Sequence, residues 1–198
     1  MRKAVIDFSA VQRGELNVGE LATRVTLPEL IAATNEQIDA FVALVHDLSD
    51  REVTFIAKDS TAQDPTGAAA EGWNVAHVIA HFTATSEENA AISSILARGI
   101  PYPFEPRLRS EVEWTRLTTA TGCLQRLEES RRIQLSYLNA WPDMPNVDTE
   151  RTLPEAFAAR VGKINAVGAV LLGLLHGDGH RAHIQEITAQ AVGVLETL

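Results

Sequence analysis

Four long stretches of this chain carry apolar side chains at helical spacing, and this periodicity restricts the fold more than any other feature. They run from about Leu27 to Leu48, Asn74 to Leu96, Arg107 to Leu138 and Lys163 to Leu195. In each stretch apolar residues recur every three or four positions, which places them on one face of an α-helix. Strand signals are weak: residues 4–8 could be extended, but a single strand without a partner is not stable. The pattern predicts an all-α four-helix bundle, up-and-down or with crossover connections.

Residues that start and stop helices support these bounds. Asn74 is a good N-cap for the second helix, and Pro101 follows its end. Pro154 to Val161 is expected to form a short helix of its own, ended by a glycine. The connections at residues 49–73 and 140–153 are long for loops, and we expect them to shape the mouth of a pocket.

Charge and composition exclude several classes of partner. The formal net charge of −9 argues against binding to nucleic acid or to an anionic membrane surface, because phosphate contacts need clustered Lys and Arg. The sequence has no run of about eighteen apolar residues, the length that a membrane-spanning helix needs, so no spanning helix is expected. The first residues have too short an apolar core for a secretory signal, and Asp7 interrupts it. A cytoplasmic protein is therefore expected, and its lone cysteine, Cys123, is expected to be a small buried apolar group.

The motif HGDGH, residues 176–180, carries the strongest functional signal. His176 and His180 lie four positions apart, so both imidazoles lie on the same face of the last helix. Two aligned imidazoles can form half of a metal site or part of an acid–base pair. Gly177 and Gly179, which lie between them, each weaken a helix by about 0.5–1 kcal/mol relative to alanine. They indicate either close packing or space for a ligand beside the histidines.

Five of the six histidines fall in two clusters, on the second and fourth helices. His77 and His81 share one face of the second helix, beside its apolar stripe. On the fourth helix, His176 and His183 are seven positions apart, about 10.5 Å along the axis, which is too far for one small ion. The workable pairs are His176 with His180 or His180 with His183, and the glycines favour the first. Several imidazoles facing a bundle core need hydrogen-bond partners or a metal.

Two motifs resemble the DinB/YfiT-like superfamily, which includes the mycothiol-dependent maleylpyruvate isomerases. In GWNVAHVIAHF, Trp73 opens the second helix and His81 follows eight residues later. In HGDGHRAHI, His176, His180 and Arg181 form a His-x-x-x-His-Arg pattern late in the fourth helix. The resemblance covers about residues 27 to 196. We therefore divide the chain into an N-terminal extension, residues 1–25, and a DinB-like four-helix bundle domain, residues 26–198.

The resemblance implies a three-histidine site for a divalent metal ion, zinc or nickel, with His81, His176 and His180 as ligands. His77, one turn before His81, and His183 are the alternatives for a ligand position. The implied activity is that of a metal-dependent enzyme acting on a small molecule: thiol transfer, thiol-dependent isomerisation or hydrolysis, with an external low-molecular-weight thiol. The competing class is a non-enzymatic metal-binding or interaction protein whose site is structural or vestigial.

The chain departs from the family pattern at two places. His183 stands where many relatives have glutamine, and Ala84 stands where many have an acid; the nearest acids are Glu87 and Glu88, one turn on. The catalytic candidates that remain are Asp178, as a base or an orienting group, and Arg181, as a partner for a substrate carboxylate.

The remaining histidine and the tryptophans are expected to be structural. His46 near the end of the first helix is interpreted as a surface residue. The tryptophans are expected to pack at the bundle entrance, in the core or at an interface: Trp73, Trp114 and Trp141.

A homodimer is expected, since Trp114 would extend the apolar stripe of a long third helix to a second buried face, and relatives often dimerise. Light scattering at micromolar concentration measures the mass directly. A monomer mass there would reject the expectation.

Overall fold

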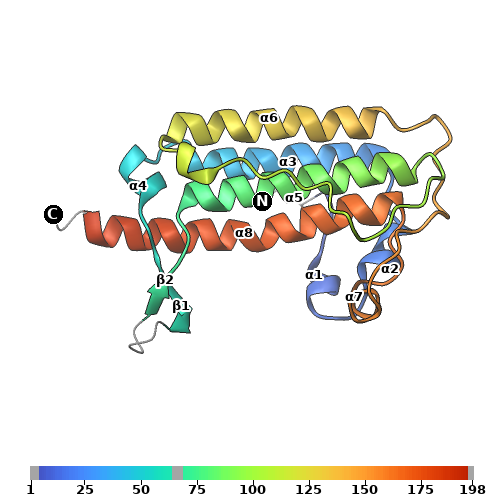
Figure 1. Cartoon of the computed structure of the whole chain (residues 1–198), viewed down its shortest axis with the longest axis horizontal. Helices are drawn as coiled ribbons and strands as arrows, with labels where there is room; N and C mark the ends of the chain where they lie inside the picture. Colours follow the sequence, from blue (N-terminus) through green and yellow to red (C-terminus); the bar gives the residue numbers. More distant parts are fainter. Residues whose placement is uncertain (1–4, 64–68, 196–198) are drawn as a thin grey trace.

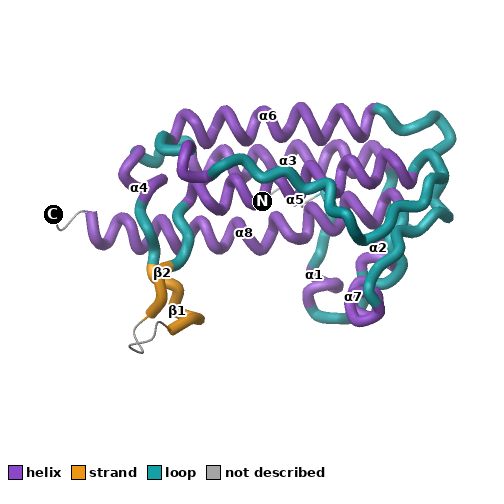
Figure 2. Tube along the Cα trace, viewed as in Figure 1, coloured by secondary structure: helices purple, strands orange, loops and turns teal. Residues whose placement is uncertain are grey.

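The computed structural model describes residues 5–63 and 69–195, and it is mostly helical (Figures 1 and 2). Four long helices lie side by side: α3 (Leu27–Val45), α5 (Val75–Leu96), α6 (Ala120–Asn139) and α8 (Ala166–Leu195). Helices α3 and α5 each pack against both α6 and α8. The prediction of a mainly helical protein is therefore confirmed. The site-bearing helices α5 and α8 are in direct contact.

Helix boundaries follow the capping residues. The side chain of Asn74 accepts a hydrogen bond from the backbone N–H of His77 at 2.8 Å, so α5 begins where the sequence predicts. Thr26 and Glu29 form a capping box at the start of α3. Helix α7 (Glu155–Val161) is the expected short helix, and it ends at Gly162, whose φ of 78° suits glycine.

The third long helix starts later than predicted. It was expected from Arg107, but α6 begins at Ala120, where the Thr119 side chain accepts a hydrogen bond from Gly122 N–H at 3.0 Å. Within residues 107–119 the structure has one helical turn, the short 3-10 helix η1 (Trp114–Arg116). The residues before this turn run without regular structure along the bundle (Figure 2). Its backbone is bound by side chains instead: Leu108 N–H donates to the Glu88 carboxylate at 3.0 Å.

The connection between α3 and α5 contains elements that the periodicity did not predict. A short helix, α4 (Asp50–Thr54), is followed by the antiparallel hairpin of β1 (Lys58–Gln63) and β2 (Ala69–Glu71). The hairpin is fastened to α8, because the Gln190 amide accepts from Lys58 N–H at 2.8 Å and donates to the Lys58 carbonyl at 3.0 Å. No strand forms at residues 5–8.

The N-terminal segment lies against the bundle. It contains α1 (Ser9–Gln12) and α2 (Val18–Ala22), and α2 contacts α8. Phe8, Val18 and Ala22 are buried in one core cluster with residues of α3, α5 and α8. This segment, treated as an extension in the sequence, therefore shares its apolar core with the helices.

No single helix within residues 5–63 and 69–195 is long and apolar enough to cross a membrane. Only the pair α7 and α8, bent by 84°, meets the length and composition requirement jointly.

The two glycines of the HGDGH motif have opposite surroundings. A Cβ atom on Gly177 would lie 2.6 Å from the Gln37 amide carbon, and that buried amide donates to the Leu174 carbonyl at 2.7 Å. A Cβ atom on Gly179 would meet nothing within 4 Å. Close packing explains the first glycine, and open space surrounds the second.

We expect Gly177→Ala to displace the Gln37 amide and to destabilise the fold by about 1–3 kcal/mol, the cost of a broken buried hydrogen bond. Gly179→Ala in the same helix is the matched control and should stabilise by about 0.5–1 kcal/mol, because alanine favours helix. Urea unfolding in the presence of EDTA measures both. In a Gln37→Ala background the penalty of Gly177→Ala should shrink; an undiminished penalty would contradict the packing explanation.

Candidate metal centre

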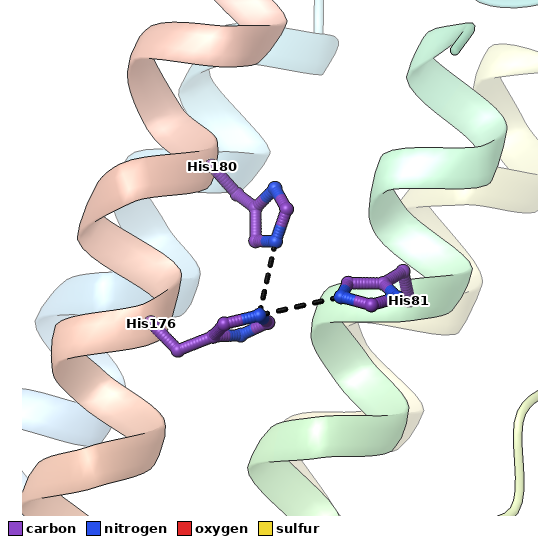
Figure 3. Close-up of side chains that lie close together, drawn as sticks. All are labelled: His81, His176 and His180. Atoms are coloured by element: carbon purple, nitrogen blue, oxygen red, sulfur yellow. Dashed lines mark hydrogen bonds between the residues drawn. The ribbon is translucent and has the colours of Figure 1, made fainter. Parts of the chain in front are cut away.

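Three imidazole rings converge between α5 and α8 (Figure 3). The Nε2 atoms of His81 and His176 are 3.3 Å apart, and those of His176 and His180 are 3.2 Å apart. One nitrogen from each ring lies within 4.8 Å of the other two. Tetrahedral ligands at Zn–N distances of about 2.0–2.1 Å are separated by about 3.3 Å, so these spacings fit one small ion. The three residues can hold a metal ion.

The packing of α5 on α8 creates this convergence. His81 lies one helical turn after His77 on α5, while His176 and His180 lie one turn apart on α8. The closest approach of the helices is marked by Gly173, where a Cβ would lie 3.3 Å from Asn89 Cβ and 3.5 Å from Ser86 Cα. A larger residue there would separate the helices just before the first histidine of α8.

Burial and neighbouring groups keep the three imidazoles unprotonated. Burial, the largest cause, together with neighbouring histidines and Arg109 lowers the pKa of His81, His176 and His180 to about 4 in each case. At neutral pH all three rings therefore carry a free nitrogen lone pair, which is the form that binds a metal.

Arg109 and Glu111 contact the far side of the His81 ring, and the sequence reasoning missed both. Arg109 Nη2 lies 2.6 Å from His81 Nδ1, and a Glu111 carboxylate oxygen lies 3.7 Å from the same atom. The two side chains also form an ion pair with each other. In residues 105–113 every second side chain is charged, and this pattern could have drawn attention to the segment. The sequence analysis instead predicted a helix from Arg107, in which residues at every second position do not share a face.

His77 and His183 lie beside the three-nitrogen group but outside it. His77 is held between two tryptophans: Trp73 stacks on its ring at 4.1 Å between centroids and Trp114 at 4.9 Å. The His183 ring is 6.0 Å from that of His180 and 5.8 Å from that of Trp73. Trp73 and Trp114 therefore belong to an aromatic wall at the histidines, and Trp114 is not part of the α6 face on which the dimer expectation drew. Trp141 is buried in the core.

Asp178 and Arg181 are not brought to the three histidines. They lie 3.7 Å from each other and line a small cavity with Gln37 on the α3 side of α8. Burial raises the pKa of Asp178, and Arg181 partly offsets this. Because each residue turns about 100° around a helix, Asp178 lies on another face from His176 and His180.

The acids nearest to Ala84 are both paired with arginine. Glu88 is 2% exposed and binds Arg107 through two hydrogen bonds, one of them 2.7 Å long. Glu87 pairs with Arg126. Neither carboxylate is therefore free to act as a base at the centre.

The remaining candidates are structural, as predicted. Cys123 is buried, and burial raises the pKa of its thiol to about 12, so it stays protonated. His46 is exposed at the end of α3 beside Asp47.

Comparison with known proteins gives no relative. No family model, no curated protein and no solved structure matches the chain.

The depressed pKa values predict how the metal-free fold responds to acid. Between pH 6.5 and about 4 the unfolded chain protonates these histidines while the folded chain does not. The free energy of unfolding should therefore rise with pH across this window, and the stabilisation should be lost as pH falls through it.

Urea unfolding of EDTA-treated protein at pH 4.5 to 7 measures this dependence. Replacing His81, His176 and His180 together by glutamine should flatten it, whereas His46→Gln, the exposed control, should leave it unchanged. Equal slopes for the wild type and the triple variant would show that the three rings are not held neutral by burial.

Proposed function

We propose that His81, His176 and His180 hold a divalent metal ion, zinc or nickel, and that the chain is a metal-dependent enzyme acting on a small molecule. The convergence of three Nε2 atoms carries this proposal. A neutral imidazole has one N–H and one lone pair, so three such nitrogens facing one point cannot all satisfy one another. One cation satisfies three lone pairs at once.

The protonation of His81 follows from its neighbours. Arg109 can only donate hydrogen bonds, so its contact with Nδ1 places the lone pair on Nδ1 and the proton on Nε2. Ligation through Nε2 requires the opposite tautomer, with the proton on Nδ1. The Glu111 carboxylate would then have to move from 3.7 Å to hydrogen-bond distance of Nδ1 to accept that proton, and in that position it would fix the ring and raise its basicity. Arg109, paired with Glu111, balances the charge of that carboxylate.

Two features support an enzyme rather than a closed structural site. Three protein ligands leave coordination positions for substrate, and a divalent ion there supplies a Lewis acid that can activate water or a thiol. Cavities reach the cluster from two sides: one is lined by His176 and another by His180 and His183. A substrate can therefore approach the ligands.

The class of reaction rests on the resemblance to the DinB/YfiT-like superfamily. Its motifs name the same three histidines that the structure brings together, on long helices packed as in a four-helix bundle. We propose thiol transfer, thiol-dependent isomerisation or hydrolysis, with a low-molecular-weight thiol supplied from outside, since the buried Cys123 cannot serve.

A non-enzymatic metal-binding protein is the second candidate. The observation that favours it is that Glu87, Glu88 and Glu111 are all paired with arginines, which leaves none of these carboxylates free for general-base chemistry. An activity screen of metal-loaded protein with common low-molecular-weight thiols separates the two candidates.

Metal stoichiometry of six single alanine variants tests the ligand set. Replacing His81, His176 or His180 removes a direct bond to the ion and should nearly abolish metal binding. His77→Ala and His183→Ala should retain the metal, because those rings lie outside the three-nitrogen group. His46→Ala is the exposed control.

Elemental analysis after identical purification gives the metal content of each variant. Full metal occupancy in His176→Ala would overturn the assignment. Loss in His77→Ala with retention in His81→Ala would move the third ligand back by one helical turn.

A further inference from the structure

A cavity of about 860 Å³ lies between the N-terminal segment, α7 and the helices α5 and α8. Its volume is in the range of small-molecule sites, roughly 300–1,000 Å³. Of the three clustered histidines, only His176 lines it. The Nδ1 atom of His176 is buried and has no hydrogen-bond partner within the described ranges. The cavity therefore reaches from the N-terminal segment to one ligand of the metal centre.

Two of the three arginines that line this cavity, Arg107 and Arg151, lie near one buried carboxylate, that of Glu88. Arg107 forms an ion pair with Glu88, which is 2% exposed. Arg151 is 7% exposed, and no ion pair of its guanidinium is found in residues 5–63 and 69–195. Burial opposes ionisation of Glu88, but the hydrogen bonds from Arg107 and Leu108 N–H outweigh it and lower the pKa of Glu88. With Glu88 already engaged by Arg107, this wall carries an excess positive charge.

The guanidinium of Arg151 is under-used and held in place. It can donate five N–H bonds, but Nη2 donates to the Phe104 carbonyl at 3.2 Å and buried Nε has no partner. Both guanidiniums lie over the Phe104 ring, with Arg151 at 5.3 Å and Arg107 at 5.9 Å from its centroid. Glu88 and Glu105 attract this guanidinium, but no carboxylate forms an ion pair with it in the described ranges, and burial lowers the pKa of Arg151. A buried cation without a direct ion pair is costly, and an anionic ligand would relieve that cost.

The acids of the cavity are engaged locally. Glu15 accepts two hydrogen bonds from Arg13, and Glu20 accepts from the backbone N–H of Asn17 in the capping box of α2. Within residues 5–63 and 69–195, neither carboxylate forms an ion pair with Arg151.

The rest of the lining mixes polar residues, among them Asn17, Asn89 and Arg160, with an apolar part formed by α7 and α8. Phe157 of α7 and Leu172 and Leu175 of α8 line the cavity, and Phe157 lies 6.2 Å from Phe104 between ring centroids. These surfaces favour a ligand with an aromatic or branched aliphatic body, rather than a free inorganic anion.

We infer that this cavity binds a small organic carboxylate, with its charge on Arg151 and its apolar body against Phe157 and the leucines of α8. Because His176 lines the same cavity, the carboxylate is the substrate class of the metal centre. That second step rests on the proposed function, whereas binding of the carboxylate does not require a metal.

Titration of the full-length protein with four small molecules tests the inference, and changes in ¹H–¹⁵N chemical shifts report binding. The titrations are done on the protein as purified and after EDTA treatment. Benzoate carries both features, benzyl alcohol lacks the charge, and acetate and inorganic phosphate lack the apolar body. We expect benzoate to bind at least about tenfold more tightly than each of the others, because charge-assisted hydrogen bonds and apolar burial both contribute. Equal affinity for benzoate and benzyl alcohol, or tighter binding of phosphate, would overturn the inference.

Variants of Arg151 test whether this residue binds the carboxylate group of benzoate. Arg151→Gln should weaken benzoate binding at least about tenfold, and Arg151→Lys should weaken it less, since lysine keeps the charge but not the planar fork. Arg116→Gln, an exposed arginine outside the cavity, is the matched control and should bind as the wild type does. Circular dichroism identifies the folded variants. If both Arg151 variants fold and bind benzoate as tightly as the wild type does, the role of Arg151 is refuted. If Arg151→Gln does not fold, unchanged benzoate affinity in Arg151→Lys refutes it.

Cobalt(II)-loaded protein separates this inference from the proposed function. Benzoate should change the visible spectrum of bound cobalt in the wild type, and an unchanged spectrum with benzoate bound would refute its delivery to the centre. If the histidines hold no cobalt while Arg151-dependent benzoate binding persists, the proposed function fails and the carboxylate site stands. If cobalt binds without Arg151-dependent benzoate binding, the carboxylate site fails alone.

Discussion

The contact between α5 and α8 determines where the functional groups of this protein lie. Most residues of α5 and of the first third of α8 are buried, and Gly173 allows the helices to approach where a larger side chain would meet Asn89 and Ser86. One turn further along α8, His176 faces His81 across this contact, with 3.3 Å between their Nε2 atoms. Dense packing makes such a spacing rigid, because neither helix can shift without opening a void. The geometry needed for metal binding is thus set by apolar packing.

The electrostatics of the centre come from a segment without regular structure. The connection between α5 and α6 places Arg107 on Glu88 and Arg109 and Glu111 on His81. These contacts replace the helical hydrogen bonds that the segment does not form. Such a segment can direct charged side chains toward neighbouring helices, and it places the Glu111 carboxylate on the side of the His81 ring that faces away from His176.

The centre lies between two differently built cavities. On one side are the hairpin, Trp73 and His183; on the other are the N-terminal segment, α7 and three arginines. The second contains a buried arginine, Arg151, that forms no ion pair within the described residues, beside the apolar side chains of α7 and α8. The N-terminal segment, outside the family resemblance, forms one wall of that cavity.

The sequence by itself determined the features that depend on neighbours within about one helical turn. These include the helical periodicity, the Asn74 cap of α5, the glycine that ends α7, and the pairing of His176 with His180. Helical spacing placed His77 and His81 on one face, but only the family resemblance chose His81 as the partner of His176, which lies 95 residues away. Tertiary structure alone decided that Arg109 reaches His81, that α6 starts at Ala120, and that Arg151 lines the same cavity as His176. The physical reason is that local hydrogen bonds and spacing fix a helix, whereas contacts between distant residues follow from how the helices pack.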